Sequence, residues 1–431
     1  MRKRLRALAT SLVLIVAVAL FIRADFAWNY AHRQPRQALR VIPFLFESGN
    51  IAYSLDSGRG FASPFRVDTG PTAWMTPVYP LLLAGVFRVF GAYTFGAWVA
   101  AVALNILFIV LACVPIFYAA KRIAGVGVAA LAGWLWAVFP NAILLPVESM
   151  WDACLAALLA ATVLWATLAL DGSRRWLGWC GYGLLWGLAL MTTPTLASVL
   201  PLLLAWLAYR GWKHGRPWIS KPAVALAIAL ACCIPWTVRN YRVFHAFIPL
   251  RSILGLQLWV GNNPEAREVW LGEQHPIHDS AERDRYVQMG EVAYVREKGR
   301  NALHFMFTHP GREAFLIGHR FLAFWSGGTP HPVRDFFASS SLWFRYVLLF
   351  NVLAAVGALA GIVILWRRRN PFFIPVGVMP VVIPFAYYLT LALPRYRLLI
   401  DPSALLLAAV TLWELANRGR RVAVPWGPAR P

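Results

Sequence analysis

Residues 96–122 read GAWVAAVALNILFIVLACVPIFYAAKR, an apolar run without a charged residue before Lys121 and Arg122. An α-helix rises about 1.5 Å per residue, so roughly 20 apolar residues cross a hydrocarbon core about 30 Å thick. Lipid offers no hydrogen-bond partners to an open backbone, so a crossing segment of this kind must be helical. The stretch therefore predicts a membrane-spanning helix that ends at a basic cluster.

The rest of the chain repeats this pattern. Of 431 residues, 59% are hydrophobic and 14% are charged, whereas soluble domains carry about 25% charged residues. We therefore expect an all-α polytopic membrane protein with about ten transmembrane helices and additional helices in its external loops. The predicted spans are residues 7–24, 96–119, 125–140, 150–170, 176–192, 195–209, 222–238, 343–366, 372–392 and 399–416.

The formal charge of +22 raises the question of nucleic-acid binding. The Lys and Arg residues gather at the ends of apolar blocks, as the positive-inside rule requires. No basic stripe with interleaved aromatic residues remains, so we expect no nucleic-acid partner. The clusters are residues 1–6, 121–122, 174–175, 210–221, 367–369 and 418–421.

Placing these clusters in the cytoplasm gives the chain its expected organisation. Residues 1–238 form an N-terminal membrane bundle with an external catalytic loop at 25–94. Residues 239–342 form an external, periplasmic segment, and residues 343–431 form the C-terminal membrane helices. Residues 75–91 are apolar enough to span, but a crossing there would move Lys121 and Arg122 outside. We therefore expect an interfacial helix in their place.

Several common types of site are excluded by the sequence. It contains no Walker loop, G-x-G-x-x-G, H-E-x-x-H or G-x-S-x-G motif, which argues against nucleotide hydrolysis, zinc proteolysis and lipase chemistry. The five cysteines lie inside apolar blocks without metal-ligand or redox spacing, so we expect neither disulfides nor structural zinc. A G-x-x-x-G at residues 357–361 is either a close helix contact or incidental.

Candidate catalytic chemistry starts with an acid in the first external segment. Glu47 stands just before a helix-like run at 51–55. A carboxylate at this point can accept a proton from an attacking hydroxyl, or it can simply be an acid stabilised at a helix N-terminus. Asp25, Asp56 and Asp68 compete for the same role.

Two arginines mark a second candidate region. Arg395 and Arg397 join two apolar blocks with almost no linker, on the side away from the basic clusters. A planar guanidinium binds phosphate oxygens through two N–H groups, so a lipid-linked phosphate suits them. The alternative is that both side chains are interfacial anchors. Asn262 and Asn263, farther back in the chain, are either ligands for sugar hydroxyls or ordinary turn residues.

Taken together, several stretches resemble the GT-C membrane glycosyltransferases, specifically the branch of dolichyl-phosphate-mannose protein mannosyltransferases and aminoarabinose transferases. The resemblance implies a sugar on polyprenyl phosphate that is bound at the outer face and transferred with inversion at the anomeric carbon. Many relatives carry an Asp or an Asp-Glu pair in the first external loop, where this chain has Phe46, Glu47 and Ser48. The matching stretches are 47–60, 76–82, 235–236, 239–241, 261–264, 395–397 and 401–402.

We therefore expect an inverting glycosyltransferase that moves a hexosyl or pentosyl unit from a polyprenyl-phosphate donor to a protein, lipid or glycan acceptor. Its expected location is the inner (plasma) membrane, in contact with membrane lipids, with the active site on the periplasmic side. No cofactor is expected, since a charged phosphate leaves readily without a metal, although a divalent cation is compatible with the site. A transporter or flippase, which needs charged or broken helices at mid-membrane, and a nonenzymatic assembly factor for envelope polymers are the alternatives.

The expected site residues fall into three groups by role. Glu47 is the expected base, with Asp25 or Asp56 as substitutes. The expected ligands of the donor phosphate are Arg395, Arg397 and Arg239. The expected residues of the acceptor or sugar pocket are Tyr53, Glu148, Asp152, Asn262 and Asn263.

Overall fold

The computed structural model describes residues 10–148, 150–215, 219–267, 272 and 274–417. These residues form helices and contain no β-strand, only one isolated bridge between Ala62 and Pro71. The predicted all-α polytopic class is confirmed, because five helical runs in this part of the chain are long and apolar enough to cross a membrane. The basic clusters predicted at 1–6 and 418–421, and residues 7–9 of the first predicted span, lie outside the described residues.

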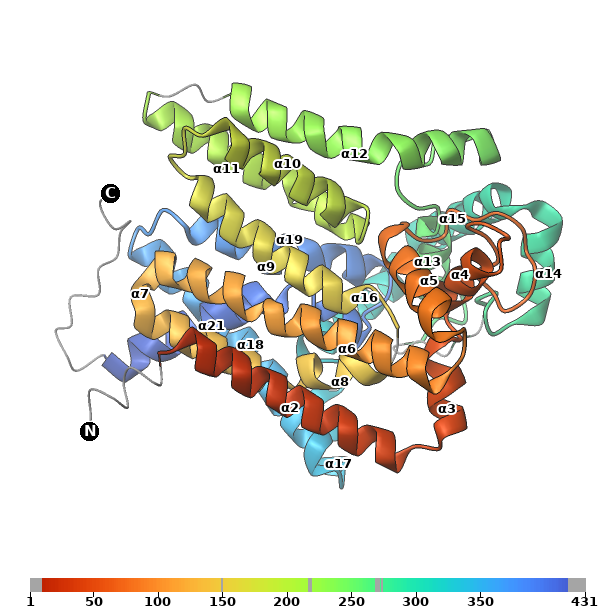
Figure 1. The fold of residues 1–431 in the computed structure, drawn as a ribbon, viewed down its shortest axis with the longest axis horizontal. Helices are drawn as coiled ribbons and strands as arrows, with labels where there is room; N and C mark the ends of the chain where they lie inside the picture. The colour runs from red at the N-terminus through yellow and green to blue at the C-terminus, as the bar shows by residue number, and fades with distance from the viewer. Residues whose placement is uncertain (1–9, 149, 216–218, 268–271, 273, 418–431) are drawn as a thin grey trace.

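The spanning helices run side by side in one bundle (Figure 1). Four of the five candidate runs are single helices, and the fifth, Phe95–Glu148, contains three. Shorter helices complete the bundle. The helices are α2 (Leu12–Arg33), α6 (Phe95–Leu111), α7 (Cys113–Ala137), α8 (Pro140–Glu148), α9 (Ala153–Leu170), α10 (Trp176–Leu190), the 3-10 turn η2 (Pro194–Ser198), α11 (Leu200–Lys213), α12 (Ser220–Phe244), α18 (Leu342–Arg367), α19 (Phe373–Leu389), α20 (Pro394–Arg397) and α21 (Asp401–Asn417).

The break predicted between residues 119 and 125 lies inside α7. Ala124 and Gly125 leave the helical conformation there, and Gly125 takes a φ of +81°, which a residue without a Cβ adopts at little cost. Trp136 Nε1 donates to the carbonyl oxygen of Ile109 at 2.8 Å, so the second half of α7 returns beside α6. The two spans predicted for this region are therefore separated by a reversal of the chain.

The G-x-x-x-G at residues 357–361 marks a close helix contact. A Cβ at Gly361 would overlap the carbonyl oxygen of Leu407, and one at Gly357 would lie 3.0 Å from the Cβ of Ala408. Small residues therefore allow α18 and α21 to approach closely, as is common between membrane helices.

The first span carries a buried arginine. Arg23 is 1% exposed, and it donates to carbonyl oxygens of Trp136 and Ala137 at the end of α7 and of Ala142 in α8. The last carbonyls of a helix lack partners within it, so Arg23 satisfies groups that lipid could not. The predicted span ended at residue 24, whereas α2 continues to Arg33.

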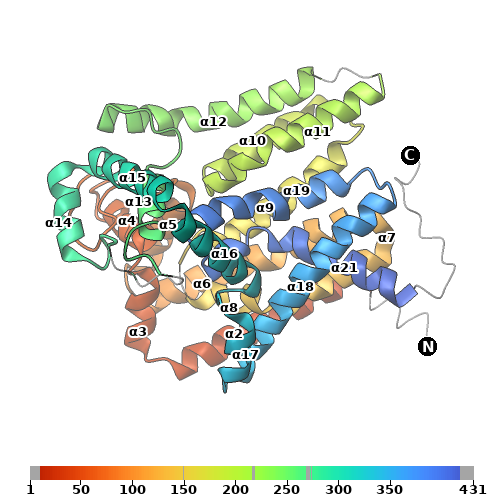
Figure 2. The ribbon, with the colours of Figure 1, turned by 180° about the vertical axis from the view of Figure 1, so that it is seen from behind.

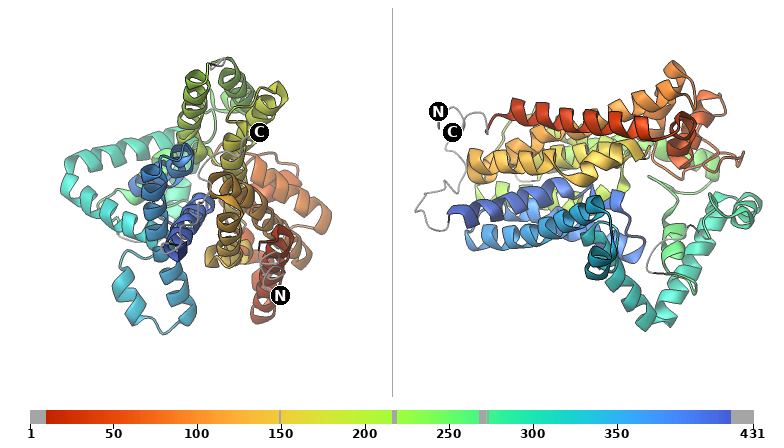
Figure 3. Two further views of the ribbon diagram at one scale, coloured as in Figure 1. Left: turned by 90° about the vertical axis from the view of Figure 1, so that its left-hand side faces the viewer. Right: turned by 90° about the horizontal axis from the view of Figure 1, so that it is seen from below.

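Most of the two segments predicted to be external (residues 25–94 and 239–342, named below the first and second external segments) gathers at one end of the bundle, and α2 begins and α21 ends at the other (Figures 1, 2 and 3). A helix forms in the predicted interfacial stretch 75–91, and its 13 residues are about 20 Å long, too short to cross. The external elements are α3 (Arg36–Val41), the 3-10 turn η1 (Ile42–Phe44), α4 (Glu47–Asp56), α5 (Val78–Phe90), α13 (Leu254–Gly261), α14 (Ser280–Met289), α15 (Glu291–Thr308), α16 (Pro310–Ser326) and α17 (Pro332–Ala338).

The two external segments share one core although they are far apart in the sequence. Phe65 and Trp74 from the first pack in a buried cluster with Leu256 and Tyr286 from the second. The buried carboxylate of Glu291 ties the segments together by accepting hydrogen bonds. Its donors are Thr72 Oγ1 (2.5 Å), Ala73 N (2.8 Å), Ser252 Oγ (2.7 Å) and Tyr286 OH (2.7 Å).

Candidate active site

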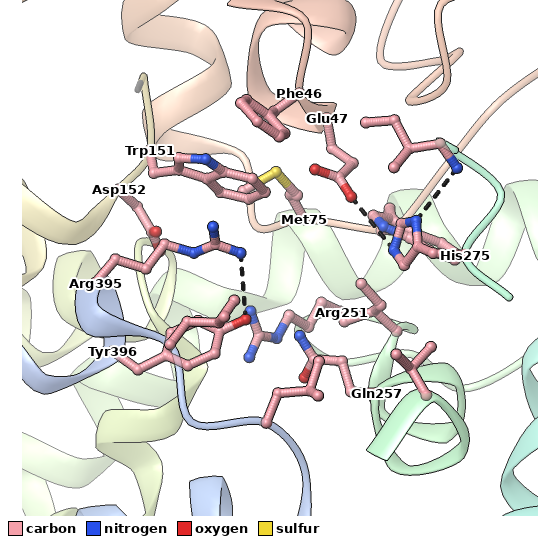
Figure 4. Close-up of a pocket in the computed structure, with 16 residues that line it drawn as sticks. Phe46, Glu47, Met75, Trp151, Asp152, Arg251, Gln257, His275, Arg395 and Tyr396 are labelled. Carbon is pink, nitrogen blue, oxygen red and sulfur yellow. Dashed lines mark hydrogen bonds and ion pairs between the residues drawn. The ribbon is translucent and has the colours of Figure 1, made fainter. Parts of the chain in front are cut away.

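A cavity lies where the shared external core meets the bundle (Figure 4). Aromatic residues form much of its wall, including Trp74 from the first external segment and Trp151 at the start of α9. Polar side chains reach it from four separate parts of the chain. They are Glu47, Asp152, Arg251, Gln257, His275, Arg395 and Tyr396.

Glu47 is the first residue of α4, and its side chain is buried. Its Oε1 lies 3.5 Å from His275 Nε2, and its Oε2 is buried without a hydrogen bond from the described residues. Burial raises the pKa of Glu47, while its own backbone N–H, the charge of Arg395 and the Trp74 indole oppose the shift. A carboxyl pKa raised toward the working pH is what a general base needs.

His275 lies beside this carboxylate as a neutral imidazole. Burial, and then the charges of His278 and Arg395, lower the pKa of His275 to about 3. Its Nδ1 accepts a hydrogen bond from the backbone N–H of Ile277 at 3.2 Å. A neutral imidazole has one donor and one acceptor nitrogen, so the ring proton is assigned to Nε2, the nitrogen that lies 3.5 Å from Glu47 Oε1.

Arg251 and Arg395 face the same space as Glu47 (Figure 4). The guanidinium of Arg395 lies 4.0 Å from the centre of the Trp151 ring and makes a long 3.4 Å hydrogen bond to Tyr396 OH. Its buried Nε has no acceptor among the described residues. Arg251 forms no ion pair within the part of the chain that the structure describes. Both arginines therefore keep N–H groups available for an anionic ligand.

The predicted pocket residue Asp152 is also in the cavity. It precedes α9 without capping that helix through its side chain. Burial raises the pKa of Asp152, and the nearby charges of Arg251 and Arg395 oppose the shift. Glu148, at the end of α8, is not among the lining residues.

The stretch at residues 235–241 positions Arg251 rather than touching the cavity. Trp236 Nε1 donates to Leu250 O at 2.6 Å, and Asn240 Nδ2 donates to Ile248 O at 3.0 Å. On the other side of the arginine, Ser252 N donates to Ala73 O at 2.9 Å. Residues 248–252 are thus held from both α12 and the first external segment.

Arg397 does not reach the cavity, contrary to the prediction that it binds the donor phosphate. Its side chain is fully buried, and it donates to Asp401 Oδ1 at 2.9 Å, to Asn351 O at 2.9 Å and to Trp325 O. These contacts use all three guanidinium nitrogens. Arg397 therefore anchors α20, the short helix that presents Arg395.

Arg239 is likewise a structural residue and not a phosphate ligand in this arrangement. It donates to the carbonyl oxygens of Thr72 at 2.6 Å and Phe61 at 2.8 Å, which fastens the first external segment to α12. Its guanidinium also lies over the Trp236 ring, 5.1 Å from the centre. It does not line the cavity.

The predicted pocket asparagines instead close the end of α13. Asn262 Nδ2 donates to Leu389 O at 2.8 Å, and Asn263 Nδ2 donates to Trp259 O at 2.9 Å. Helix ends leave carbonyls that need such donors. Neither asparagine lines the cavity, so the turn interpretation fits the structure.

The remaining predicted residues lie elsewhere. Asp25 is exposed on α2, and Asp56 ends the helix that Glu47 begins. Asp68 is exposed and accepts hydrogen bonds from Ser63 Oγ and Gly70 N. Tyr53 lines a separate recess on α4. Glu47 is thus the one of these first-segment acids that the structure brings to the cavity.

Sequence reasoning missed Arg251, Gln257, His275, Trp74 and Trp151. Of these, His275 had a usable signal, since it lies in the long polar stretch 262–300. Nothing in the local sequence distinguishes Arg251 from a boundary arginine. Its role depends on contacts with residues more than 100 positions away.

Comparisons with known proteins agree with this architecture. The family described as dolichyl-phosphate-mannose-protein mannosyltransferase matches residues 74–238. Archaeal oligosaccharyltransferase AglB from Archaeoglobus fulgidus, solved in complex with an inhibitory peptide and a dolichol-phosphate, matches with a TM-score of 0.53 and 14% identity, over 97% of this chain and 52% of that chain. The chain therefore shares its helical membrane fold with this oligosaccharyltransferase. The resemblance drawn from the sequence is therefore confirmed at this level.

Two further proteins are similar to this chain. The undecaprenyl phosphate-alpha-4-amino-4-deoxy-L-arabinose arabinosyl transferase of Pseudomonas paraeruginosa is 40% identical over 84 residues, which are 19% of this chain and 15% of that protein. ArnT from Cupriavidus metallidurans bound to undecaprenyl phosphate has a TM-score of 0.39 at 15% identity, over 94% of this chain and 78% of that chain. The chain spans about half the length of the archaeal enzyme.

The family match covers only part of the cavity. Residues 74–238 include Trp74, Trp151 and Asp152. Glu47 and Arg395 lie outside the matched range, as do Arg251 and His275. The chemistry of the cavity therefore has to be argued from this chain's own geometry.

Proposed function

We propose that this protein is an inverting glycosyltransferase that moves a hexosyl or pentosyl unit from a polyprenyl-phosphate donor to a protein, lipid or glycan acceptor. One observation carries the proposal. A single cavity holds a buried carboxylate, Glu47, whose Oε2 has no partner in the described structure, and two guanidinium groups, Arg251 and Arg395, that face it. A base for a hydroxyl and a cationic site for a leaving phosphate are the two parts that this reaction requires.

The proposed step is one displacement at the anomeric carbon. The acceptor oxygen attacks from the face opposite the phosphate, and the new C–O bond forms as the bond to the phosphate oxygen breaks. Glu47 takes the hydroxyl proton, and the electron pair of the broken bond leaves with the phosphate. Arg251 and Arg395 stabilise the charge that develops there, while the His275 N–H orients the Glu47 carboxylate.

The scheme runs without a cofactor. The two arginines supply the positive charge that a metal would otherwise bring to the phosphate. Asp152 lies beside the proposed phosphate site and is assigned to the hydroxyls of the transferred sugar.

We place the cavity at the periplasmic side of the inner membrane, within reach of lipid-linked donors. Basic residues from the clusters at 121–122 and 210–221 support this orientation, because two of them meet at the far end of the bundle. There, Arg122 donates to Asp171 O, and Arg210 pairs with the Asp171 carboxylate at 2.7 Å. Positive charge concentrates on the cytoplasmic side of membrane proteins.

A labelling experiment tests the orientation. Single cysteines replacing Ser280 in α14 and Ser340 before α18 are expected to react with a membrane-impermeant maleimide in intact cells. A cysteine replacing Ser173, between α9 and α10, is expected to react only after the cells are opened. Labelling of the Ser173 variant from outside would reverse the proposed sidedness.

The activity itself is tested with purified protein in detergent, radiolabelled polyprenyl-phosphate sugars and a panel of protein, lipid and glycan acceptors. The expected result is transfer by the wild type and its loss in Glu47→Gln, with Asp25→Asn as the matched control because Asp25 is exposed on α2. Donor binding without transfer to any acceptor would contradict the enzyme assignment and favour a transporter or an assembly factor.

A further inference from the structure

A second recess lies beside the catalytic cavity, around α4. Its volume is about 310 Å³, at the lower end of the range for ligand pockets. Leu45 lines the recess, whereas the next two residues, Phe46 and Glu47, line the cavity. The start of α4 is therefore a wall shared by the two spaces.

The recess has the chemistry of an anion site. Arg59 and Arg66 line it together with one acid, Asp68. Asp68 Oδ1 already accepts from Ser63 Oγ at 2.9 Å and from Gly70 N at 3.2 Å. Neither arginine forms an ion pair in the described part of the chain; Arg59 donates to Ser57 Oγ, and Arg66 donates to Leu45 O. Positive charge in the recess therefore exceeds negative charge.

Aromatic rings and residues with positive φ also line the recess. The rings of Tyr53 and Tyr93 lie 5.3 Å apart, and Arg59 lies over the Tyr53 ring at 5.5 Å. Six non-glycine residues in the described structure have positive φ, and three of them line this recess: Ser63 (55°), Arg66 (52°) and Tyr93 (55°). Such conformations cost free energy and concentrate at functional sites.

We propose that this recess binds the anionic group of an acidic saccharide acceptor. The guanidinium groups of Arg59 and Arg66 hold the carboxylate or phosphate, and the rings of Tyr53 and Tyr93 pack against the sugar ring. The assignment of this saccharide as the acceptor rests on the proposed function. In that reaction the acceptor must approach Glu47 from the side away from the phosphate, and the recess lies across the α4 wall from the cavity that holds Arg251 and Arg395.

The charge of Arg66 links the two spaces. Arg66 is one of the cations that oppose the rise in the pKa of Glu47. An anion bound to Arg66 would neutralise that effect and raise the carboxyl pKa further. Occupation of the recess would therefore strengthen Glu47 as a base at the moment when an acceptor is present.

Binding of model saccharides to the purified protein tests the proposal without a transfer assay. The probes are galacturonate, for a carboxylate, and glucose 6-phosphate, for a phosphate, with galactose as the uncharged control, each titrated by saturation-transfer NMR. We expect the acidic sugars to bind more tightly than galactose. Arg59→Gln should weaken the binding of at least one acidic probe by about tenfold, the scale of a charged hydrogen bond.

Three variants make the result decisive. Arg59→Gln carries the test because the Arg59 side chain is exposed, and its one hydrogen bond in the described structure goes to the nearby Ser57 Oγ, so the fold should tolerate the change. Arg334→Gln, an exposed arginine of α17, should leave binding unchanged, and Arg251→Gln reports on the donor cavity. Equal binding of galactose, or loss of binding in Arg251→Gln but not in Arg59→Gln, would overturn the proposal. Failure of sugar transfer would leave this binding result standing.

Discussion

Two buried carboxylates, one in the cavity and one in the shared external core, have opposite surroundings. The oxygens of Glu291 are met by four donors from three separate segments. Glu47 has an Oε2 with no donor in the described structure and an Oε1 that is 3.5 Å from His275 Nε2. Buried polar groups without partners cost free energy. Glu291, whose carboxylate is hydrogen-bonded by four donors, joins the two external segments. Glu47, whose Oε2 lacks a donor among the described residues, is the acid that we assign to a substrate.

The largest expected effect comes from Glu47→Gln. Because the amide keeps the shape but cannot take a proton, the transfer rate should fall about 100-fold or more, the range of general-base removal. The dissociation constant of the donor should change little. Rates from single-turnover assays, together with donor titrations, measure both quantities. A rate within threefold of wild type would remove Glu47 from the mechanism.

The thermal stability of Glu47→Gln should not fall together with its transfer rate. The pKa of Glu47 is raised in the folded protein, so between its unfolded and folded pKa values the folded state holds a proton that the unfolded state has lost. Stability from this group therefore falls as pH rises through that window. At pH above the window, Glu47→Gln should unfold at the same temperature as wild type or at a higher one.

Glu291→Gln is the matched substitution in the scaffold. An amide nitrogen would face donors that now bind a carboxylate oxygen, so the free energy of unfolding should fall by about 2–4 kcal/mol. Thermal unfolding in detergent measures the loss. The rate per folded molecule should stay near that of wild type. A stable, inactive Glu291→Gln protein would show that the two acids do not divide their roles as described.

Arg395 and Arg397 extend the comparison to two residues on one short helix. Arg395→Lys replaces a two-pronged donor by a point charge and should raise the Michaelis constant for the donor about tenfold, with unchanged thermal stability. Arg397→Lys leaves Asp401 and two carbonyls poorly paired, so it should lower stability by about 2 kcal/mol and leave the Michaelis constant near wild type. The reverse pattern would assign the phosphate to Arg397.

The smallest effect concerns His275. Since the pKa of His275 is about 3, an acid limb near neutral pH belongs to Glu47 and not to the imidazole. His275→Ala removes an N–H that favours the ionised carboxylate, so the pKa of Glu47 should rise. The acid limb of kcat/KM against pH should then move upward by up to about one pH unit. A shift to lower pH would contradict the inferred tautomer.

The apolar parts of the chain were the most predictable from sequence. Lipid imposes a length and a helical backbone on every crossing segment, so the break near residue 124 could be located in advance, whereas the sequence left open whether Gly357 and Gly361 make a helix contact. The end of α2 was misjudged because Arg23 finds carbonyl partners in α7 and α8. In the sequence alone, such a charged residue looks like the end of the apolar segment, whereas in the folded protein its hydrogen bonds allow the helix to continue.

The candidate site was predicted less well, for a related reason. Glu47, Arg395 and Asp152, each a charge at a membrane boundary, do line one cavity, and the roles expected for them stay predictions. Arg397 has the same local signature, and only Asn351 and Asp401 decide its different role. Arg251 carries no local signal at all, because its place in the cavity depends on the first external segment, where Ala73 O accepts from Ser252 N.

The core shared by the two external segments can form only after the second segment has been synthesised. Phe65 and Trp74 leave the ribosome long before Leu256 and Tyr286, the residues that cover them. Until those residues follow, an aromatic surface stays open to other proteins, as in many partly folded chains. A chain that stops before residue 239 would keep that surface exposed, so truncated products should be recognised and degraded by quality-control proteases.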